Sequence, residues 1–335
     1  MPRRCWRLLA VSSAFVFLGL SNAVASSRYC DSQVALTPGQ QSKLLRFGEV
    51  VKAELEASGQ STALLARSGL NLARFGIRYS HAGISLKDSQ NTPWSVRQLY
   101  YACDERKPRI FDQGMAGFVL GTDNAAVGYV SAVLLPPDAA KAFETAALDN
   151  RQALALLHPI YSPNAYAYGL RYQNCNQWVM ELLATALGKL GLTHEAAQRP
   201  TADTKQDVAL DLAPDSSQDS AQVSQPTAAR TGAQAWLRQQ GYLPSIVEVG
   251  SRLLMWAGAF IPLVRSDDHP KDDLAQLRYQ VTMPASIEGF VQAKLPDAQR
   301  IEFCHNEQHI VVHRGWTPVA EGCVPSLEDR VIALD

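Results

Sequence analysis

The sequence predicts an α+β protein in which helices pack against an antiparallel sheet. Three observations favour this class. Residues 36–58 carry apolar side chains at helical spacing after a Thr-Pro helix entry. Residues 75–135 divide into short β-type segments separated by Asn, Asp, Pro and Gly. Residues 174–188 then return to an apolar helical pattern, so helix, sheet and helix follow one another along the chain.

The first 25 residues have the pattern of a secretory signal peptide. A basic start, "MPRRCWR", is followed by the apolar run "LLAVSSAFVFLGL" and the small-residue motif "AVA", with cleavage expected near Ala25. The apolar run is too short to span a membrane. The sequence therefore predicts a periplasmic or secreted protein with no transmembrane span in the mature chain.

Elements follow in order along a first domain, predicted over 26–193. We expect helices at 36–58 and 63–72, strands at 75–87, 94–104, 109–113 and 125–135, and helices starting at Pro136 and Asn174.

A polar segment separates this domain from the C-terminal part. Residues 194–232 are rich in Ser, Asp, Gln, Thr, Pro and Ala and contain no aromatic residue, which is typical of a disordered insert or linker. Residues 233–335 read as a small C-terminal α+β region. Within it, the uncharged stretch 253–264 indicates either a core helix or a lid over an apolar substrate.

Cysteine usage singles out one thiol. Of six cysteines, Cys5 lies in the signal segment, which leaves an odd number in an oxidising compartment. Cys304 and Cys323 are close in sequence around an expected hairpin, so we pair them. Cys30 and Cys103 then pair by elimination, and Cys175 stays free.

Charge and motifs exclude several functions. The formal net charge is −1, without a basic stripe, so nucleic acid is not expected as a partner. His305, His309 and His313 have a spacing that would suit a metal on a helix, but their surroundings alternate like a hairpin. The acidic turn 267–269 is interpreted as a solvated loop. No phosphate-binding loop or serine elbow is present, and we expect no metal and no cofactor.

Cys175 and His81 are the candidates for chemistry. Asn174 can cap a helix whose first turn contains Cys175, and the free N–H groups and dipole of a helix start favour a thiolate and can hold an oxyanion. His81 lies in the strand "YSHAGISL", where alternation places Ala82 and Ile84 on one face and His81 and Gly83 on the other. Gly83 leaves room beside the imidazole for a helix end. The alternative is that this cysteine and this histidine are structural.

These residues carry a resemblance. "SHAGI" resembles the histidine strand of the NlpC-type papain-like cysteine peptidases, and "NCNQW" follows it some ninety residues later. That order, histidine before cysteine, is similar to the circularly permuted branch that includes the lecithin:retinol acyltransferase-like proteins, and points to an uncharacterised bacterial family of exported proteins. The resemblance implies a permuted papain-like domain with Cys175 as nucleophile and His81 as general base. Its third polar residue would be Gln98, where the family pattern has a histidine.

The function expected is amide or ester hydrolysis, or acyl transfer, by a Cys-His dyad. The substrate would be a cell-wall peptide or a lipid-like acyl group, with association of the protein with the cell envelope. Tyr172 and Asn174 could support the oxyanion, although a cap is the simpler role for Asn174. The rival is a non-catalytic envelope or binding protein that retains the fold, favoured by Gln98 in place of histidine.

Overall fold

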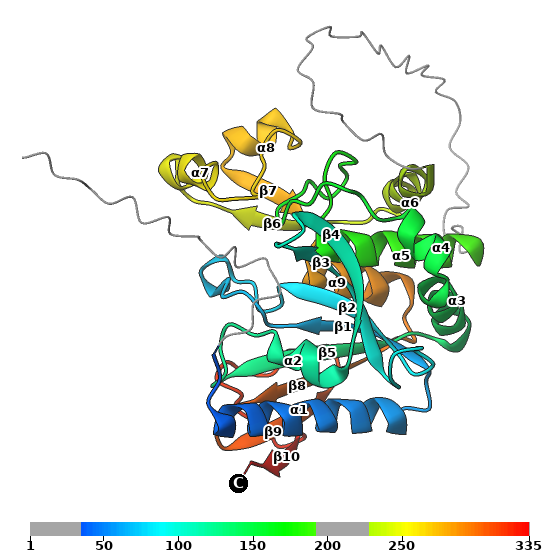
Figure 1. Cartoon of the computed structure of the whole chain (residues 1–335), viewed down its shortest axis with the longest axis vertical. Helices are drawn as coiled ribbons and strands as arrows, with labels where there is room; N and C mark the ends of the chain where they lie inside the picture. Colours follow the sequence, from blue (N-terminus) through cyan, green and yellow to red (C-terminus); the bar gives the residue numbers. More distant parts are fainter. Residues whose placement is uncertain (1–34, 192–227, 335) are drawn as a thin grey trace, which may run out of the picture.

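The structure is a computed structural model that describes residues 35–191 and 228–334 (Figure 1). Within these residues, eight antiparallel strands form one sheet in the order β10-β9-β8-β5-β1-β2-β3-β4, and β6 and β7 form a separate ribbon. The strands are β1 (Thr62–Arg67), β2 (His81–Leu86), β3 (Ser95–Ala102), β4 (Lys107–Gln113), β5 (Gly128–Leu134), β6 (Ser245–Glu248), β7 (Arg278–Val281), β8 (Gln299–His305), β9 (His309–Arg314) and β10 (Arg330–Ala333).

Helices lie on both faces of the large sheet. They are α1 (Pro38–Ala57), α2 (Met115–Leu120), α3 (Pro137–Leu148), α4 (Asn150–Ala155), α5 (Cys175–Lys189), α6 (Ala228–Gln239), α7 (Arg252–Gly258), α8 (Lys271–Ala275) and α9 (Pro284–Lys294), with one 3-10 turn, η1 (Ala73–Phe75). The prediction of an α+β protein with helices packed against an antiparallel sheet is confirmed.

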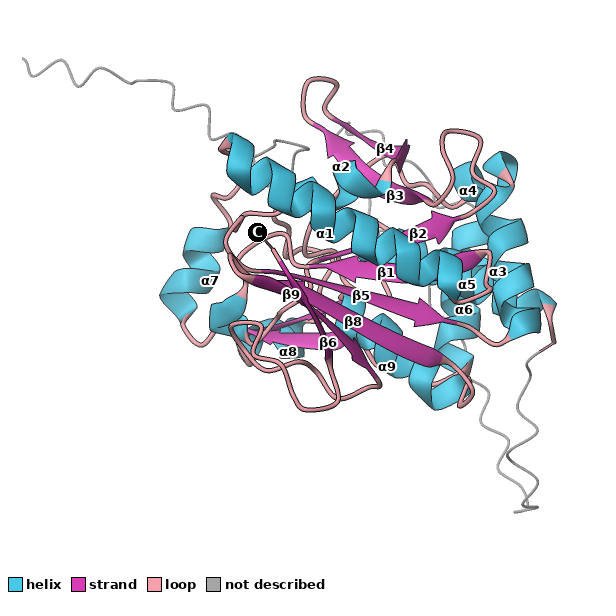
Figure 2. Ribbon diagram, turned by 90° about the horizontal axis from the view of Figure 1, so that it is seen from below, coloured by secondary structure: helices cyan, strands magenta, loops and turns pink. Residues whose placement is uncertain are grey.

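One face of the sheet is covered by α1 and α2. Figure 2 shows α1 lying over the strands of the sheet. Thr37 begins this helix as predicted, with its side chain accepting from the Gln40 N–H in a capping box. Apolar side chains of α1 and α2 pack there on residues of β1, β3 and β5 that include Leu65, Val96 and Val130.

The other face carries α3, α5, α6 and α9. Their side chains form a second core with Ala82, Ile84 and Leu86 of β2 and Leu99 of β3. Because successive strand residues point to opposite faces, β2 presents this set to α5 and presents His81, Gly83 and Ser85 to the α1–α2 side. The face assignment made from alternation is therefore confirmed for the apolar set.

The helix expected at 63–72 is wrong. Residues Thr62–Arg67 form β1, a central strand in which all six residues are buried between β2 and β5. Ala and Leu favour helices in isolation, but burial between two strands overrides that preference.

The C-terminal region is not a separate small extension. β8 pairs along its whole length with β5, and Ile287 and Val291 of α9 lie in the same core as α5. Residues predicted as a distinct ending therefore complete the main sheet. Of the expected linker, 194–227 lies outside the described residues, as does the signal segment, and α6 already begins at Ala228.

The stretch 253–264 is not a core helix. Leu253, Trp256 and Phe260 are 70, 63 and 70 % exposed. This segment contains α7, beside the β6–β7 ribbon at the end of the molecule away from α1 (Figure 1). No helix among the described residues has the length and apolar character needed to cross a membrane.

Two parts of the expected cysteine scheme are confirmed. Cys304 and Cys323 form a disulfide, and Cys175 is free and buried. Cys103 is also disulfide-bonded, and its expected partner Cys30 lies outside the described residues.

Candidate functional site

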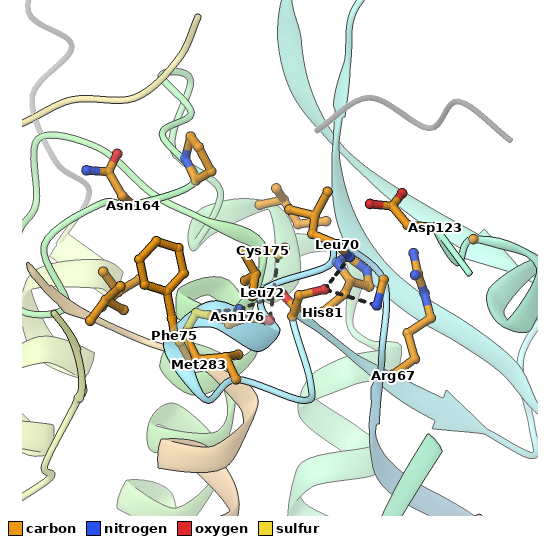
Figure 3. A pocket seen from close by; sticks show the side chains of 18 of the residues that line it. Arg67, Leu70, Leu72, Phe75, His81, Asp123, Asn164, Cys175, Asn176 and Met283 are labelled. Carbon is orange, nitrogen blue, oxygen red and sulfur yellow. Dashed lines mark hydrogen bonds between the residues drawn. The ribbon is translucent and has the colours of Figure 1, made fainter. Parts of the chain in front are cut away.

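A cavity of about 190 Å³ opens at the end of the sheet where β1 and β2 meet the start of α5. Cys175 and His81 both line it (Figure 3). Its walls come from the segment 69–80, from β3, from the loop 121–123 and from the β6–β7 ribbon. Apolar atoms make up most of the lining surface, and the apolar side chains that contribute to it include Leu70, Leu72, Phe75, Ile77, Leu99, Val247, Val264, Val281 and Met283.

The start of α5 places Cys175 at the cavity. Asn174 is the N-cap, and its Oδ1 accepts from the Gln177 N–H at 2.7 Å, as expected from the sequence. Trp178 and Val179 anchor the following turn in the core. Cys175 is therefore the first helical residue, and it is only 7 % exposed.

The thiol is protonated in this environment. Burial raises the pKa of Cys175 to about 11, against smaller lowering contributions from a Tyr161 side-chain hydrogen bond, backbone N–H groups and the charge of Arg67. The thiol donates to Asn176 Oδ1 at 3.6 Å. The lowered pKa expected from a helix start is wrong for this state because loss of solvation outweighs the helix end.

His81 is held by Gln98. The Nε2–H of His81 donates to Gln98 Oε1 at 2.8 Å, and Gln98 in turn donates to Gln113 Oε1 at 2.7 Å. The ring stacks on Tyr100 with centroids 4.8 Å apart. Burial first, and the charge of Arg67 second, lower the pKa of His81 to about 3, so the imidazole is neutral with its Nδ1 lone pair unprotonated.

The thiol and the imidazole approach the cavity from different faces of the sheet. Cys175 packs in the core on the α5 side, whereas the His81 ring lies on the α2 side, 6.3 Å from the Phe118 ring. Among the described contacts, no hydrogen bond joins the Cys175 thiol to His81. Gly83 does not make room for α5 either, because a Cβ there would overlap Val96 on β3.

Two further candidates lie elsewhere. The Asn174 side chain caps α5, and its Nδ2 faces the carbonyls of Pro163 and Thr282. Tyr172 donates to Asp267 Oδ2 at 3.0 Å in a neighbouring depression. Neither residue lines the cavity that holds Cys175.

Sequence reasoning missed three residues around the thiol. Asn176 ties α5 to β2, because its Oδ1 accepts from the Ala82 N–H at 2.8 Å and its Nδ2 donates to the Ser80 carbonyl at 3.2 Å. Tyr161 hydrogen-bonds the thiol. Arg67 is a buried cation on β1, directly across from His81. Only Asn176 gave a local signal, as the second asparagine of "NCN".

The acidic turn at 267–269 is partly buried rather than a solvated loop. His269 is 6 % exposed, and its ring bonds the Asn164 carbonyl at 2.7 Å. Asp268 accepts from the Tyr166 N–H at 2.8 Å. These contacts fasten the loop before α5 to the segment before α8.

The chain is thus an α+β protein in which one cavity is lined by a buried free thiol and by a neutral imidazole. The side-chain amide of Gln98 accepts a hydrogen bond from that imidazole. A family model described as "Uncharacterized protein conserved in bacteria (DUF2145)" matches residues 54–291, and the chain belongs to this family. The match runs from α1 to α9 and includes Arg67, His81, Gln98 and Cys175. No curated protein and no solved structure matches the chain.

Proposed function

We propose that the protein is an exported thiol-dependent amide or ester hydrolase, or an acyltransferase, acting at the cavity of Cys175. The observation that carries the proposal is that a free thiol at a helix start and an imidazole oriented by Gln98 line one mostly apolar cavity. A papain-like relationship, with histidine before cysteine, belongs to this proposal. So does periplasmic or secreted location, which rests on the sequence of residues 1–25.

The reaction starts from a neutral pair. Sγ of Cys175 forms a bond to the substrate carbonyl carbon while its proton passes to Nδ1 of His81, through rotation of the thiol or one water. The carbon–nitrogen or carbon–oxygen bond then breaks, and the leaving group takes the proton from His81. Water or another acceptor releases the acyl group from sulfur. Gln98 keeps Nδ1 unprotonated at the start by binding Nε2–H.

Oxyanion stabilisation can come from the start of α5. The first N–H groups of a helix have no partner within the helix, and the Cys175 N–H is among them. Tyr161 is a second donor beside the sulfur. Both stabilise negative charge that develops during attack more than they stabilise the neutral ground state.

The rival is a ligand-binding protein without turnover. It is favoured by the raised pKa of Cys175 and by the separation of thiol and imidazole on two faces of the sheet. An activity-based acyl probe, such as a p-nitrophenyl ester of a short fatty acid, separates the two. Acylation at Cys175 found by mass mapping, with loss in His81→Ala, supports the enzyme; a ligand-saturated cavity with an unmodified thiol supports the binder.

A further inference from the structure

Arg67 is a buried cation with no anionic partner in the described part of the chain. The residue is 5 % exposed, and its only hydrogen bond from the side chain to the described residues runs from Nη2 to the Tyr100 hydroxyl at 2.8 Å. Nε and Nη1 are shielded from solvent and lack acceptors. No carboxylate of the described residues lies within ion-pair distance of it, so within this part of the chain the guanidinium has no counter-charge.

The other buried arginines of the described chain are all paired. Arg97 binds Asp112, Arg230 binds Glu181, and Arg300 binds both Glu288 and Glu302. A buried charge without a counter-charge is strongly unfavourable, which is why such groups are rare in structural positions. Arg67 is the exception among the described buried arginines, and its position at the cavity offers a reason for it.

The backbone is shaped around this guanidinium. A Cβ on Gly69 would come within 2.6 Å of Nη1, and a Cβ on Gly121 would come within 2.5 Å of Nη2. Phe118 lies beneath the guanidinium, with the carbon Cζ 5.4 Å from the ring centroid. Any residue larger than glycine at 69 or 121 would displace the charge from this position.

Arg67 also lines the cavity of Cys175 and His81. Asp123 is the only carboxylate in the described lining; it is exposed and accepts from the Asn71 N–H at 3.3 Å. Among the described residues that line the cavity, Arg67 is the only lysine or arginine, so its guanidinium can pair with one monoanionic group. The remaining walls, largely apolar, suit a hydrocarbon body beside that group.

We propose that Arg67 binds a carboxylate of the ligand, and that the ligand of this cavity is a monocarboxylate with an apolar chain, such as an N-acyl amino acid. The identification of this ligand as the substrate of Cys175 rests on the proposed function; the binding itself does not. Arg67 then selects substrates that carry a carboxylate close to the scissile amide or ester. The protein accepts an unpaired buried charge in the free state, and the ligand supplies the missing acceptor.

Binding is tested by calorimetry with N-hexanoylglycine and its uncharged analogue N-hexanoylglycinamide. The protein carries Cys175→Ala, so that turnover plays no part. We expect the acid to bind at least about tenfold more tightly than the amide, as for a charge-assisted hydrogen bond. Arg67→Gln should abolish this preference, while Asp123→Asn, which removes the nearby carboxylate, should preserve or increase it.

Several results would overturn the assignment. The assignment fails if the acid and the amide bind equally well, or if the preference for the acid survives Arg67→Gln. It also fails if neither probe binds, or if hexyl phosphate binds more tightly than the acid.

Thermal stability supplies a second readout. Arg67→Gln should melt at or above the wild-type temperature, because it removes an unpaired charge, whereas Arg97→Gln should melt lower because it strands Asp112. A clear loss of melting temperature in Arg67→Gln would assign the arginine a structural role instead.

The test of carboxylate binding by Arg67 and the test of acylation at Cys175 can give different answers. If the carboxylate preference depends on Arg67 but Cys175 is never acylated, the anion site stands and the enzyme proposal fails. If Cys175 is acylated equally well by charged and uncharged esters, the enzyme proposal stands and the anion site fails.

Discussion

His81 and Gln98 are joined side chain to side chain across neighbouring strands, Nε2 to Oε1, at 2.8 Å. Because a glutamine oxygen can only accept, this bond fixes the proton on Nε2 and leaves Nδ1 as the basic nitrogen. The second bond of Gln98, to Gln113, fixes the orientation of its amide. An uncharged partner orients the ring, but it offers less stabilisation to an imidazolium than a carboxylate would.

Substitution of Gln98 should therefore change the tautomer or the pKa of His81 while the imidazole itself remains in place. Gln98→Leu is expected to lower the rate of Cys175 acylation by about tenfold or more, because the tautomer is no longer fixed. Gln98→Glu should raise the apparent pKa of His81 in the pH profile, since a carboxylate favours the cation. A purely structural role would change melting temperature in both variants and leave the pH profile in place.

The buried thiol of Cys175 should react slowly near neutral pH because burial raises its pKa. Alkylation by iodoacetamide is expected to be slower than that of an unstructured thiol near neutral pH and to rise toward the thiol pKa of about 11. Tyr161→Phe removes a hydrogen bond to sulfur and should shift this profile to still higher pH. Mass mapping identifies the modified residue. Fast labelling below neutral pH would show that the thiol is more solvated than its burial indicates.

Local signals predicted the parts of the site that depend on neighbours in sequence. Asn174 before an apolar helical run fixed the start of α5, and alternation in "HAGISL" fixed which residues of β2 face α5. The pairing of Cys304 with Cys323 followed from their closeness in sequence.

Properties set by tertiary burial could not be predicted in the same way. The residues of β1 favour a helix by composition and become a strand only because two strands flank them. The raised pKa of Cys175 and the isolation of Arg67 depend on atoms brought from distant segments. An arginine in sequence carries no mark of whether an acid will lie beside it.

Acid should destabilise the protein through its buried histidines. Burial lowers the pKa of His81 to about 3 and that of His305 to about 4, from an ordinary value of about 6.5. Below pH 6.5 the unfolded chain binds protons that the folded chain does not, so stability is lost as pH falls from there toward the folded values. The loss approaches ~1.4 kcal/mol per pH unit for each group.

His305→Gln tests this linkage at a position outside the cavity. Urea unfolding at pH 7 and pH 4.5 should show a smaller difference between the two conditions in the variant than in the wild type. Comparing the difference, rather than stability at one pH, cancels the effect of altered packing against Phe47. An unchanged difference would mean that His305 in the folded protein is already protonated at pH 4.5, with a pKa close to that in the unfolded chain.

Asn176 should couple the position of the thiol to β2. Its side chain accepts a hydrogen bond from the Ala82 N–H and donates one to the Ser80 carbonyl. Both groups precede Ile84, where the pairing of β2 with β3 begins. Asn176→Ala leaves these backbone groups unpaired at the cavity and should cost about 1–3 kcal/mol of unfolding free energy. Asn91→Ala, at an exposed loop position, is the control and should cost less unfolding free energy than Asn176→Ala.

In Asn176→Ala, Cys175 also loses the acceptor of its thiol proton, so its alkylation should become faster at a given pH. A stable variant with unchanged alkylation would show that Asn176 does not position the thiol.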